Sequence, residues 1–533
     1  MAKLQSFGRA LFHGGSRRDV SFGLLLFTIA LAIRLWGLSF GLPSFFSGDE
    51  VSKRDEALRL AETNFVHDSR QPSFVYNSLF LIYSAANAVK PDWTLIGYHY
   101  MGRLWMAVLG GLTVVALWRL GAKFDYNGGR IGLASALLLA VLPLHTACSR
   151  YIKEDAPFAL MVTLTVLAIV AALREPSRVR WMLLGLVAGL TFSTKYAGVV
   201  LIAPILLVFV ASARRAKRSV GGASVDLAAL GVAFALGFLI FSPVYLVYPE
   251  KFLSGFLFQS RYSMAGHDGI VTDPWQHGWT YYIRNGLIPG MTWPVFLLSV
   301  AGLGLLARRR DGWIVGVTAV WLYIVFEHAR AKPLPFPARY LMPLLPLLCL
   351  AAGVALVELA AALKRKLAAP LVYAVCSVLF IAPPLVKSLL ISDEALHDTR
   401  IIAGEWMEQN IPPGAKIVVT EDVSGLPVST FWRARWLVED RERSLDTSWA
   451  GDQPPYFVFS SFKFQRYLDS PDSAPERTAF YRKVMSEFTL VKEFRPRWLT
   501  YGKHSPVIRL YRPSGDRSPA SGQPFRAERN RPL

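Results

Sequence analysis

Two pairs of acidic residues could do chemistry at a membrane surface. Asp49 and Glu50 follow the first long apolar stretch, and Glu154 and Asp155 lie just before another. An ionisable group beside hydrocarbon is costly unless it is used, so two such pairs on one face favour a functional site. Asp49 is a candidate general base, with Glu50 as the group that tunes it. Glu154 and Asp155 could position a substrate, and Asp49 and Asp155 could share a divalent cation; the need for a metal stays open.

Helix capping is the competing interpretation of both pairs. Ser47-x-x-Glu50 fits a capping box for an amphipathic helix at 51–63, and spacing alone favours this role for the first pair. Asp155 or Ala156 could cap the next apolar helix, which would hold Pro157 in its first turn. If both pairs lie on one face of the membrane, one shared functional site explains them better than two independent helix caps.

Basic side chains gather on the same predicted face. Taken singly, each is typical of an interfacial anchor whose stem lies in hydrocarbon. Together they predict an anionic lipid headgroup as partner. They are Arg70, Arg150, Lys153, Lys195, Lys332 and Arg339.

The elements that position these residues must be membrane helices. Of the 533 residues, 53% belong to the AVILMFWYC set and 18% are charged, and the mean hydropathy is +0.33. Such a composition excludes a soluble cytosolic enzyme and a disordered chain. The net charge of +20 is explained by basic loops between spans, so nucleic acid is excluded as a partner.

About eleven apolar blocks have the length of a membrane span. Basic connectors separate alternate blocks, which places residues 1–19 in the cytoplasm and the region from 391 outside. The spans make up a transmembrane domain over 20–390. The blocks are 20–40, 103–120, 131–147, 157–173, 181–195, 197–213, 226–247, 287–306, 312–328, 340–362 and 368–390.

Two assignments decide this topology. The apolar run 181–213 must cross twice because basic clusters flank both of its ends, so Thr194–Tyr196 is expected at an outer turn. The stretch 73–89 has the length of a span but carries Asn77, Ser78, Ser84 and Asn87, so it is expected to be a juxtamembrane helix lying in the interface. The first outer loop then covers 41–102.

The C-terminal part has a different pattern. Residues 391–512 predict a small α/β domain on the outer face, and 513–533 have the composition of a disordered tail. Helices are expected at 398–410 and 477–488. Strands are expected at Lys416–Thr420, Tyr456–Ser460, Thr489–Phe494 and Val507–Tyr511.

The order of several short motifs resembles one family. Residues 20–415 are similar to the GT-C superfamily of integral-membrane glycosyltransferases, in the branch of the protein O-mannosyltransferases and the lipid A aminoarabinose transferase. Arg70-Gln-Pro72 replaces the Lys-Pro-Pro element whose Lys contacts a lipid phosphate in that family, and Arg can still bind phosphate, in bidentate fashion. The other matching elements are Asp49-Glu50, Arg103-Leu104, Pro143-x-His145, Ser149-Arg150-Tyr151, Thr194-Lys195-Tyr196, Arg339-Tyr340 and Asp398-Thr399-Arg400.

The resemblance implies transfer of a sugar from a polyprenyl-phosphate donor to an acceptor hydroxyl, with inversion, on the outer face of a membrane. We expect a bacterial inner membrane, although the sequence leaves an endoplasmic reticulum membrane open. The acceptor would be a glycan, a lipid or a protein. The departing lipid phosphate needs cations, for which the candidates are Arg70, Arg150, Lys195 and Arg339. Possible contacts of sugar or acceptor are His145, Tyr151, His267 and Tyr340.

Two other functions remain open. A polyprenyl-lipid or sugar transporter would line a path with the same charges, although no repeated halves are visible. A lipid-linked polysaccharide ligase would use a late outer loop, and residues 248–285 offer Arg261, His267, Asp268 and His277. The same loop could instead select an acceptor or close over the site.

Overall fold

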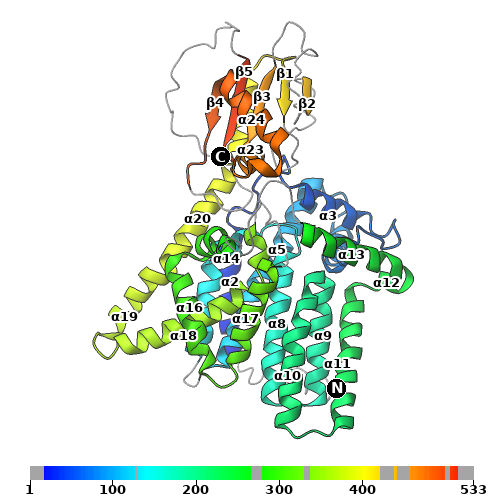
Figure 1. Ribbon diagram of the computed structural model, residues 1–533, viewed down its shortest axis with the longest axis vertical. Coiled ribbons are helices and arrows are strands. Elements are labelled where there is room, and N and C mark those ends of the chain that lie inside the picture. Colours follow the sequence, from blue (N-terminus) through cyan, green and yellow to red (C-terminus); the bar gives the residue numbers. More distant parts are fainter. Residues whose placement is uncertain are drawn as a thin grey trace.

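The computed structural model describes residues 17–125, 129–265, 279–328, 337–419, 437–440, 455–498 and 505–513. A helical body carries a smaller α/β domain at one end (Figure 1). His267, Asp268, His277 and Lys332 lie outside the described residues.

Every predicted span contains a helix. Six described helices are long and apolar enough to cross a membrane, or seven if the pair Thr280–Met291 and Trp293–Ala307, bent by 112°, is one span. The chain is therefore an integral membrane protein, and the count of eleven spans stays a prediction, because these six or seven helices come from the described residues alone. α9 is short, and α2 carries charged residues at both ends. The helices of the body are α2 (Arg17–Leu35), α5 (Leu95–Ala122), α6 (Arg130–Val141), α7 (Pro143–Cys148), α8 (Asp155–Arg174), α9 (Arg178–Thr194), α10 (Ile202–Arg215), α11 (Val220–Phe241), α16 (Trp293–Ala307), α17 (Trp313–His328), α18 (Leu345–Leu363), α19 (Ala369–Cys376) and α20 (Ala382–Leu396).

Shorter helices cover one end of this body. α3 and α4 lie in the segment predicted to be the first outer loop, and Thr194 ends α9 at the turn predicted there. α4, at the predicted juxtamembrane stretch, is among the shorter apolar helices. The remaining short elements are α3 (Gly48–Leu58), α4 (Phe74–Val89), η1 (Tyr196–Leu201), α12 (Val244–Val247), α13 (Pro249–Ala265), α14 (Trp279–Tyr282), η3 (Ile283–Leu287), α15 (Ile288–Met291), η4 (Pro337–Leu341) and η5 (Ser377–Ile381).

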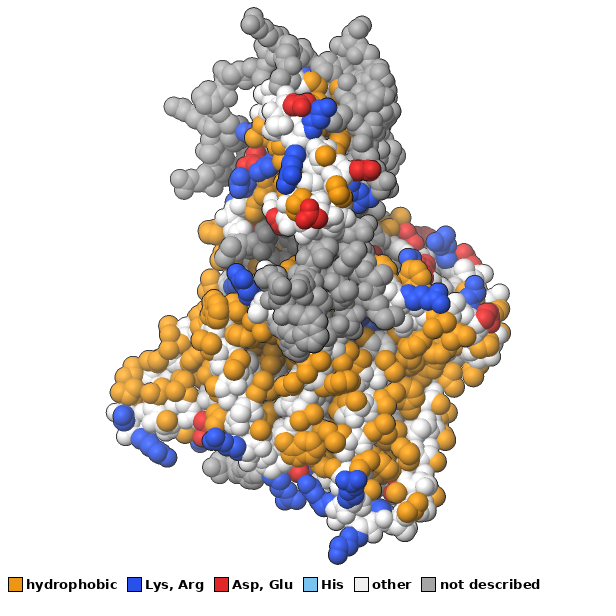
Figure 2. All heavy atoms as spheres, in the orientation of Figure 1, with side chains coloured by type: hydrophobic (Ala, Val, Ile, Leu, Met, Phe, Trp, Pro, Cys, Tyr) orange, Lys and Arg blue, Asp and Glu red, His pale blue; other side chains and the backbone are white. Residues whose placement is uncertain are grey.

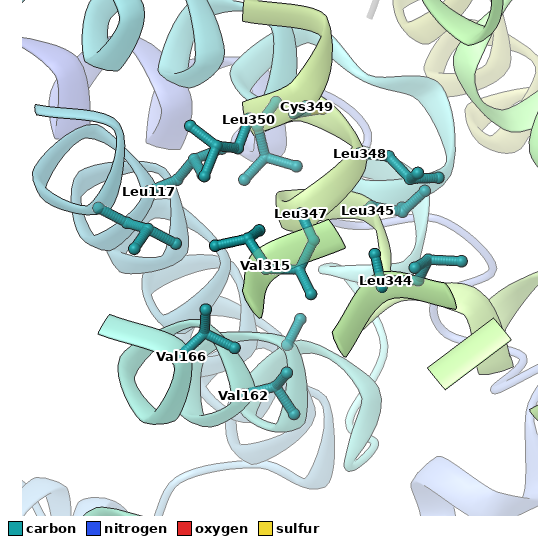
Figure 3. Packing of buried hydrophobic residues seen from close by; sticks show 14 of the residues in the cluster. Leu117, Val162, Val166, Val315, Leu344, Leu345, Leu347, Leu348, Cys349 and Leu350 are labelled. Carbon is teal, nitrogen blue, oxygen red and sulfur yellow. The ribbon is translucent and has the colours of Figure 1, made fainter. Parts of the chain in front are cut away.

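The core of the body lies where α5, α8, α17 and α18 meet. Figure 3 shows Leu117, Val162, Val166 and Val315 around the apolar face of α18. Because lipid is as apolar as these side chains, close backbone packing must help to hold the helices together. α9 and α11 use glycines for it: a Cβ on Gly189 would lie 2.0 Å from the backbone oxygen of Phe234.

Charge separates the two ends of the body. Lys and Arg side chains gather at the end opposite the α/β domain, below a band of apolar side chains (Figure 2). There the buried Asp311 lies 3.4–3.6 Å from Arg174, Arg215 and Arg310. This distribution is the one expected of basic cytoplasmic loops, and the orientation of the termini stays a prediction.

The α/β domain has a five-stranded sheet in the order β2-β1-β3-β5-β4. β1 pairs in parallel with β2 and β3, whereas β5 pairs antiparallel with β3 and β4. α20 runs past the expected boundary at 391, so the change from bundle to domain falls after Leu396. The elements are α21 (Thr399–Asn410), β1 (Lys416–Val419), β2 (Leu437–Asp440), β3 (Tyr456–Ser460), α23 (Ser461–Leu468), η7 (Pro471–Ser473), α24 (Pro475–Glu487), β4 (Phe488–Phe494) and β5 (Ile508–Pro513).

Candidate active site

Glu50 is a buried structural hub. Its carboxylate receives two hydrogen bonds from Arg103 of α5, at 3.0 and 2.9 Å, and one from the backbone N–H of Ile152 at 3.0 Å. Arg103 also donates to the backbone oxygens of Leu38 and Phe40. Glu50 thus joins α3 to α5 and to the connector before α8. The capping box is absent here, because the Ser47 side chain makes no cap hydrogen bond and the Glu50 carboxylate faces Arg103.

Asp49 lies one residue earlier and differs from Glu50 in exposure. Its side chain is 53% exposed, whereas those of Glu154, Asp155 and Glu50 are 7%, 6% and 0% exposed. Asp49 forms an ion pair with Lys153, and its Oδ2 lies 4.0 Å from Nη1 of Arg339. Of these four carboxylates, Asp49 alone is open to an incoming hydroxyl.

Two ion pairs join the segment that holds Asp49 to the segment that holds Glu154. Lys153 pairs with Asp49, and in return Lys53 of α3 pairs with Glu154 at 2.5 Å. Lys53 is a site residue that the sequence analysis missed. The available signal was weak: Lys53 lies one helical turn after Asp49 and so shares its face of α3.

Asp155 begins α8 and faces the turn after α9. Nζ of Lys195 donates to its Oδ1 at 2.8 Å, so Asp155 has an ion pair where the capping interpretation expected a cap. Lys195 also lies 4.9 Å from the ring centre of Tyr340, and the Arg339 guanidinium lies 5.2 Å from the same ring. The elements α3, α8, α9 and η4 therefore bring four cations and three carboxylates together. We call this group the charge cluster: Asp49, Lys53, Lys153, Glu154, Asp155, Lys195 and Arg339.

Electrostatics keep the hub ionised. Burial alone would raise the pKa of Glu50, but the charge and hydrogen bonds of Arg103 outweigh it and leave the pKa below its ordinary value of 4.5. Burial would lower the pKa of Lys53, and the facing carboxylate of Glu154 raises it instead. Both residues therefore carry full charges at neutral pH.

Three of the predicted contact residues are buried in the protein interior. Arg150 is fully buried and donates to the backbone oxygens of Arg34 and Ile33 and to Oγ of Ser392. His145 is buried against Arg34, 2.6 Å from its Nη2. Tyr151 is buried beside Phe40. These contacts give Arg150, His145 and Tyr151 packing roles and leave none of them exposed to substrate.

Arg70 is exposed and belongs to a different surface. It pairs with Asp68 and lies 5.8 Å from the ring centre of Phe258 in α13. A stack of His67 on Tyr76 joins this surface to the cluster, because Tyr76 also lies beneath the ammonium group of Lys53. The two surfaces also meet at Ser69, whose backbone oxygen accepts a hydrogen bond from the Tyr196 hydroxyl at 3.1 Å, so Arg70 stays a predicted ligand of the donor phosphate.

The charge cluster fits a metal ion poorly. In the described part of the chain there is no group of three or more His, Cys, Asp or Glu side chains that could hold one. Asp49 and Asp155 are each paired with a lysine, which an incoming cation would have to displace. We therefore derive no step through a metal.

Comparisons of sequence give partial matches. A sequence model of the dolichyl-phosphate-mannose-protein mannosyltransferase family matches residues 98–247. An undecaprenyl phosphate-alpha-4-amino-4-deoxy-L-arabinose arabinosyl transferase of Pseudomonas aeruginosa (strain UCBPP-PA14) is 30% identical over 267 residues, which cover 48% of this chain and 46% of the relative. The match thus spans less than half of that relative's length.

Comparisons of structure extend over nearly the whole chain. ArnT from Cupriavidus metallidurans bound to undecaprenyl phosphate has a similar fold, with a TM-score of 0.50 and 14% identity over 92% of this chain and 98% of that chain. Archaeal oligosaccharyltransferase AglB from Archaeoglobus fulgidus, in complex with an inhibitory peptide and a dolichol-phosphate, gives 0.51 and 12% over 90% and 74%. At these identities the likeness concerns the fold. In fold and in part of its sequence, the chain resembles the GT-C glycosyltransferases of the protein O-mannosyltransferase and aminoarabinose transferase branch.

Proposed function

We propose that the chain transfers a sugar from a polyprenyl-phosphate donor to an acceptor hydroxyl at the outer face of a bacterial inner membrane. The observation that carries the proposal is Asp49, an exposed carboxylate held at the membrane surface among Lys153 and Arg339. The similar ArnT fold binds undecaprenyl phosphate, which supports a lipid-phosphate donor.

The proposed reaction is a single displacement. The acceptor oxygen attacks the anomeric carbon from the face opposite the phosphate, the bond from that carbon to the phosphate oxygen breaks, and the phosphate leaves with the electron pair. Asp49 takes the proton of the acceptor hydroxyl. Configuration at the anomeric carbon is inverted, because one displacement occurs.

The cations of the charge cluster serve the leaving group. A lipid phosphate can leave without a general acid if cations stabilise its negative charge. Fixed cations in a site that excludes water stabilise that charge more strongly than cations in water do. Arg339 is the first candidate, since its guanidinium is 26% exposed and has no carboxylate closer than Asp49 at 4.0 Å among the described residues. Lys153 joins it once the acceptor engages Asp49.

The test is transfer of labelled sugar from membrane-extracted polyprenyl-phosphate sugars by the purified full chain. Asp49→Asn should lower the rate by about 10²–10⁴-fold, because Asn has similar shape but takes no proton. Asp55→Asn is the matched control, being a carboxylate of the same helix that pairs with Arg54 and should leave the rate unchanged. Full activity of Asp49→Asn would remove Asp49 as the base. If the wild type transfers no sugar from any of a range of donors, the transporter function becomes a better explanation than the glycosyltransferase function.

A further inference from the structure

The segment that leads into Asp49 is held from the C-terminal side of the chain. α20 and the start of α21 contact residues 37–46 at three places. Ser392 of α20 lies against Gly37, where a Cβ would come within 3.0 Å of its backbone oxygen. Ala395 packs with Phe40 and Tyr151 in a small buried cluster. The third contact is made by Arg400.

Arg400 lies on the ring of Phe46. Its guanidinium carbon is 3.9 Å from the ring centre, and both side chains are buried. Phe46 in turn packs against Gly41, where a Cβ would lie 2.5 Å from the ring. A cation held on an aromatic face and screened from water is a strong and directional contact. Phe46 is three residues before Asp49, so this contact fixes the approach of the chain to α3.

The α/β domain fixes Arg400 in turn. Asp398 receives two hydrogen bonds from the Arg400 side chain, both at 2.7 Å, and one at 2.8 Å from the backbone N–H of Ser505. The nearby Glu394 receives the backbone N–H groups of Arg497 and Trp498. The residues around 394–400 are thus tied to the chain between β4 and β5, and the planar guanidinium cannot move without breaking its bonds to Asp398.

We propose that Arg400 is a positioning residue for the transfer reaction: through Phe46 it holds the loop that sets Asp49, so that the α/β domain is part of the catalytic scaffold. This inference rests on the proposed function. Catalytic groups must keep their geometry closely, and a misplacement of about 1 Å can cost about 10²-fold in rate. No contact of Arg400 with a substrate is required.

The key variant is Phe46→Leu, which removes the ring and leaves the Asp398–Arg400 pair intact. We expect kcat to fall by about 10- to 10²-fold with little change in the KM of donor or acceptor. Phe46→Tyr keeps the ring and should restore the rate. The matched control is Arg509→Gln, which breaks the pair with Glu493 in the same domain and should leave kcat unchanged.

A second measurement does not depend on turnover. Ser47 is 3% exposed, so a thiol placed there by Ser47→Cys reports opening of the loop. The native Cys148, Cys349 and Cys376 are replaced first. Maleimide labelling should become about tenfold faster when Phe46→Leu is added, because losing the contact favours local opening.

The outcomes separate the two proposals. Wild-type kcat and slow labelling in Phe46→Leu, with Asp49→Asn inactive, would overturn the role of Arg400 and leave the transfer function standing. An equal loss of kcat in Arg509→Gln would show that the effect comes from the stability of the α/β domain, and it would also overturn the positioning role of Arg400. If wild type transfers no sugar, the proposed function fails, and unchanged labelling would then refute the loop contact as well.

Discussion

At the scale of single residues, adjacent carboxylates have opposite roles. Asp49 and Glu50 are neighbours on α3, yet one faces outward and the other lies fully buried between Arg103 and the backbone of Ile152. Successive residues of a helix point about 100° apart, so one of a pair can serve the structure while the other serves chemistry. In the second acidic pair both residues are buried, and each forms an ion pair with a lysine: Glu154 with Lys53 and Asp155 with Lys195.

Glu50→Gln should destabilise the protein strongly. The substitution keeps the shape but leaves the buried Arg103 without its counter-charge, which costs about 3–5 kcal/mol when one partner of a buried pair is removed. The thermal midpoint in detergent measures the effect, and Glu62→Gln, on the exposed end of the same loop, is the control. Equal midpoints for the two variants would contradict the role of Glu50 as a hub.

The same pair has a defined pH dependence. Because the folded-state pKa of Glu50 lies below 4.5, its contribution to stability is fully present above that value and is lost as the pH falls through the folded pKa. The difference in midpoint between wild type and Glu50→Gln should stay constant from pH 6 to 8 and shrink in acid below about pH 4.5. A difference that grew in acid would have the wrong sign.

The sequence predicts where charges fall but not their partners. Asp49, Glu154, Asp155, Lys195 and Arg339 were all selected from position and type, and the structure gathers them. Lys53 was missed, and Arg150 was grouped with phosphate ligands, because pairing depends on how α3 and the 149–155 connector lie together. Only the folded chain decides whether an arginine meets a carbonyl oxygen or a ligand.

At the scale of elements, apolar length and charge predict helices well. All eleven predicted blocks contain helices, and a turn lies at Lys195, where the need to cross twice predicts one. Which of these helices are full spans is harder, since a helix can be shortened or bent where neighbours satisfy its backbone. The bend of 112° at Thr292 is one such place, where a φ of 73° belongs to the left-handed region. The helix breakers Pro289, Gly290 and Pro294 surround it, and the prediction of a single block at 287–306 did not take them into account.

Packing of α9 against α11 depends on the absence of side chains. Gly189→Ala would place a methyl group 2.0 Å from a backbone oxygen of α11 and should push the helices apart, at a cost of about 1–3 kcal/mol. Gly231→Ala, in α11, is the matched control because nothing lies within 4 Å of its added Cβ. The thermal midpoint should fall for the first variant alone. Equal midpoints would show that the close approach does not contribute to stability.

At the scale of the whole molecule, α3, which carries Asp49 and Lys53, lies at the end of the body that holds the α/β domain, and Lys and Arg side chains gather at the other end (Figures 1 and 2). A polyprenyl-phosphate sugar presented at one membrane surface can be used only if both the cluster and the acceptor are there. Arg365, between α18 and α19, and Asp472, in η7, are exposed residues of the two ends. The proposed function therefore requires one particular orientation of the chain in the membrane.

Thiol labelling tests this orientation. The labelling uses a chain whose three native cysteines are replaced. In cells whose outer membrane has been removed but whose inner membrane is intact, Asp472→Cys should react with a membrane-impermeant maleimide. Arg365→Cys should react only after the inner membrane is permeabilised. The reason is that Lys and Arg in short connectors are retained on the cytoplasmic side. The reverse result would put the charge cluster in the cytoplasm, where a donor flipped to the outer leaflet could not reach Asp49. The proposed reaction would then require a donor on the inner leaflet.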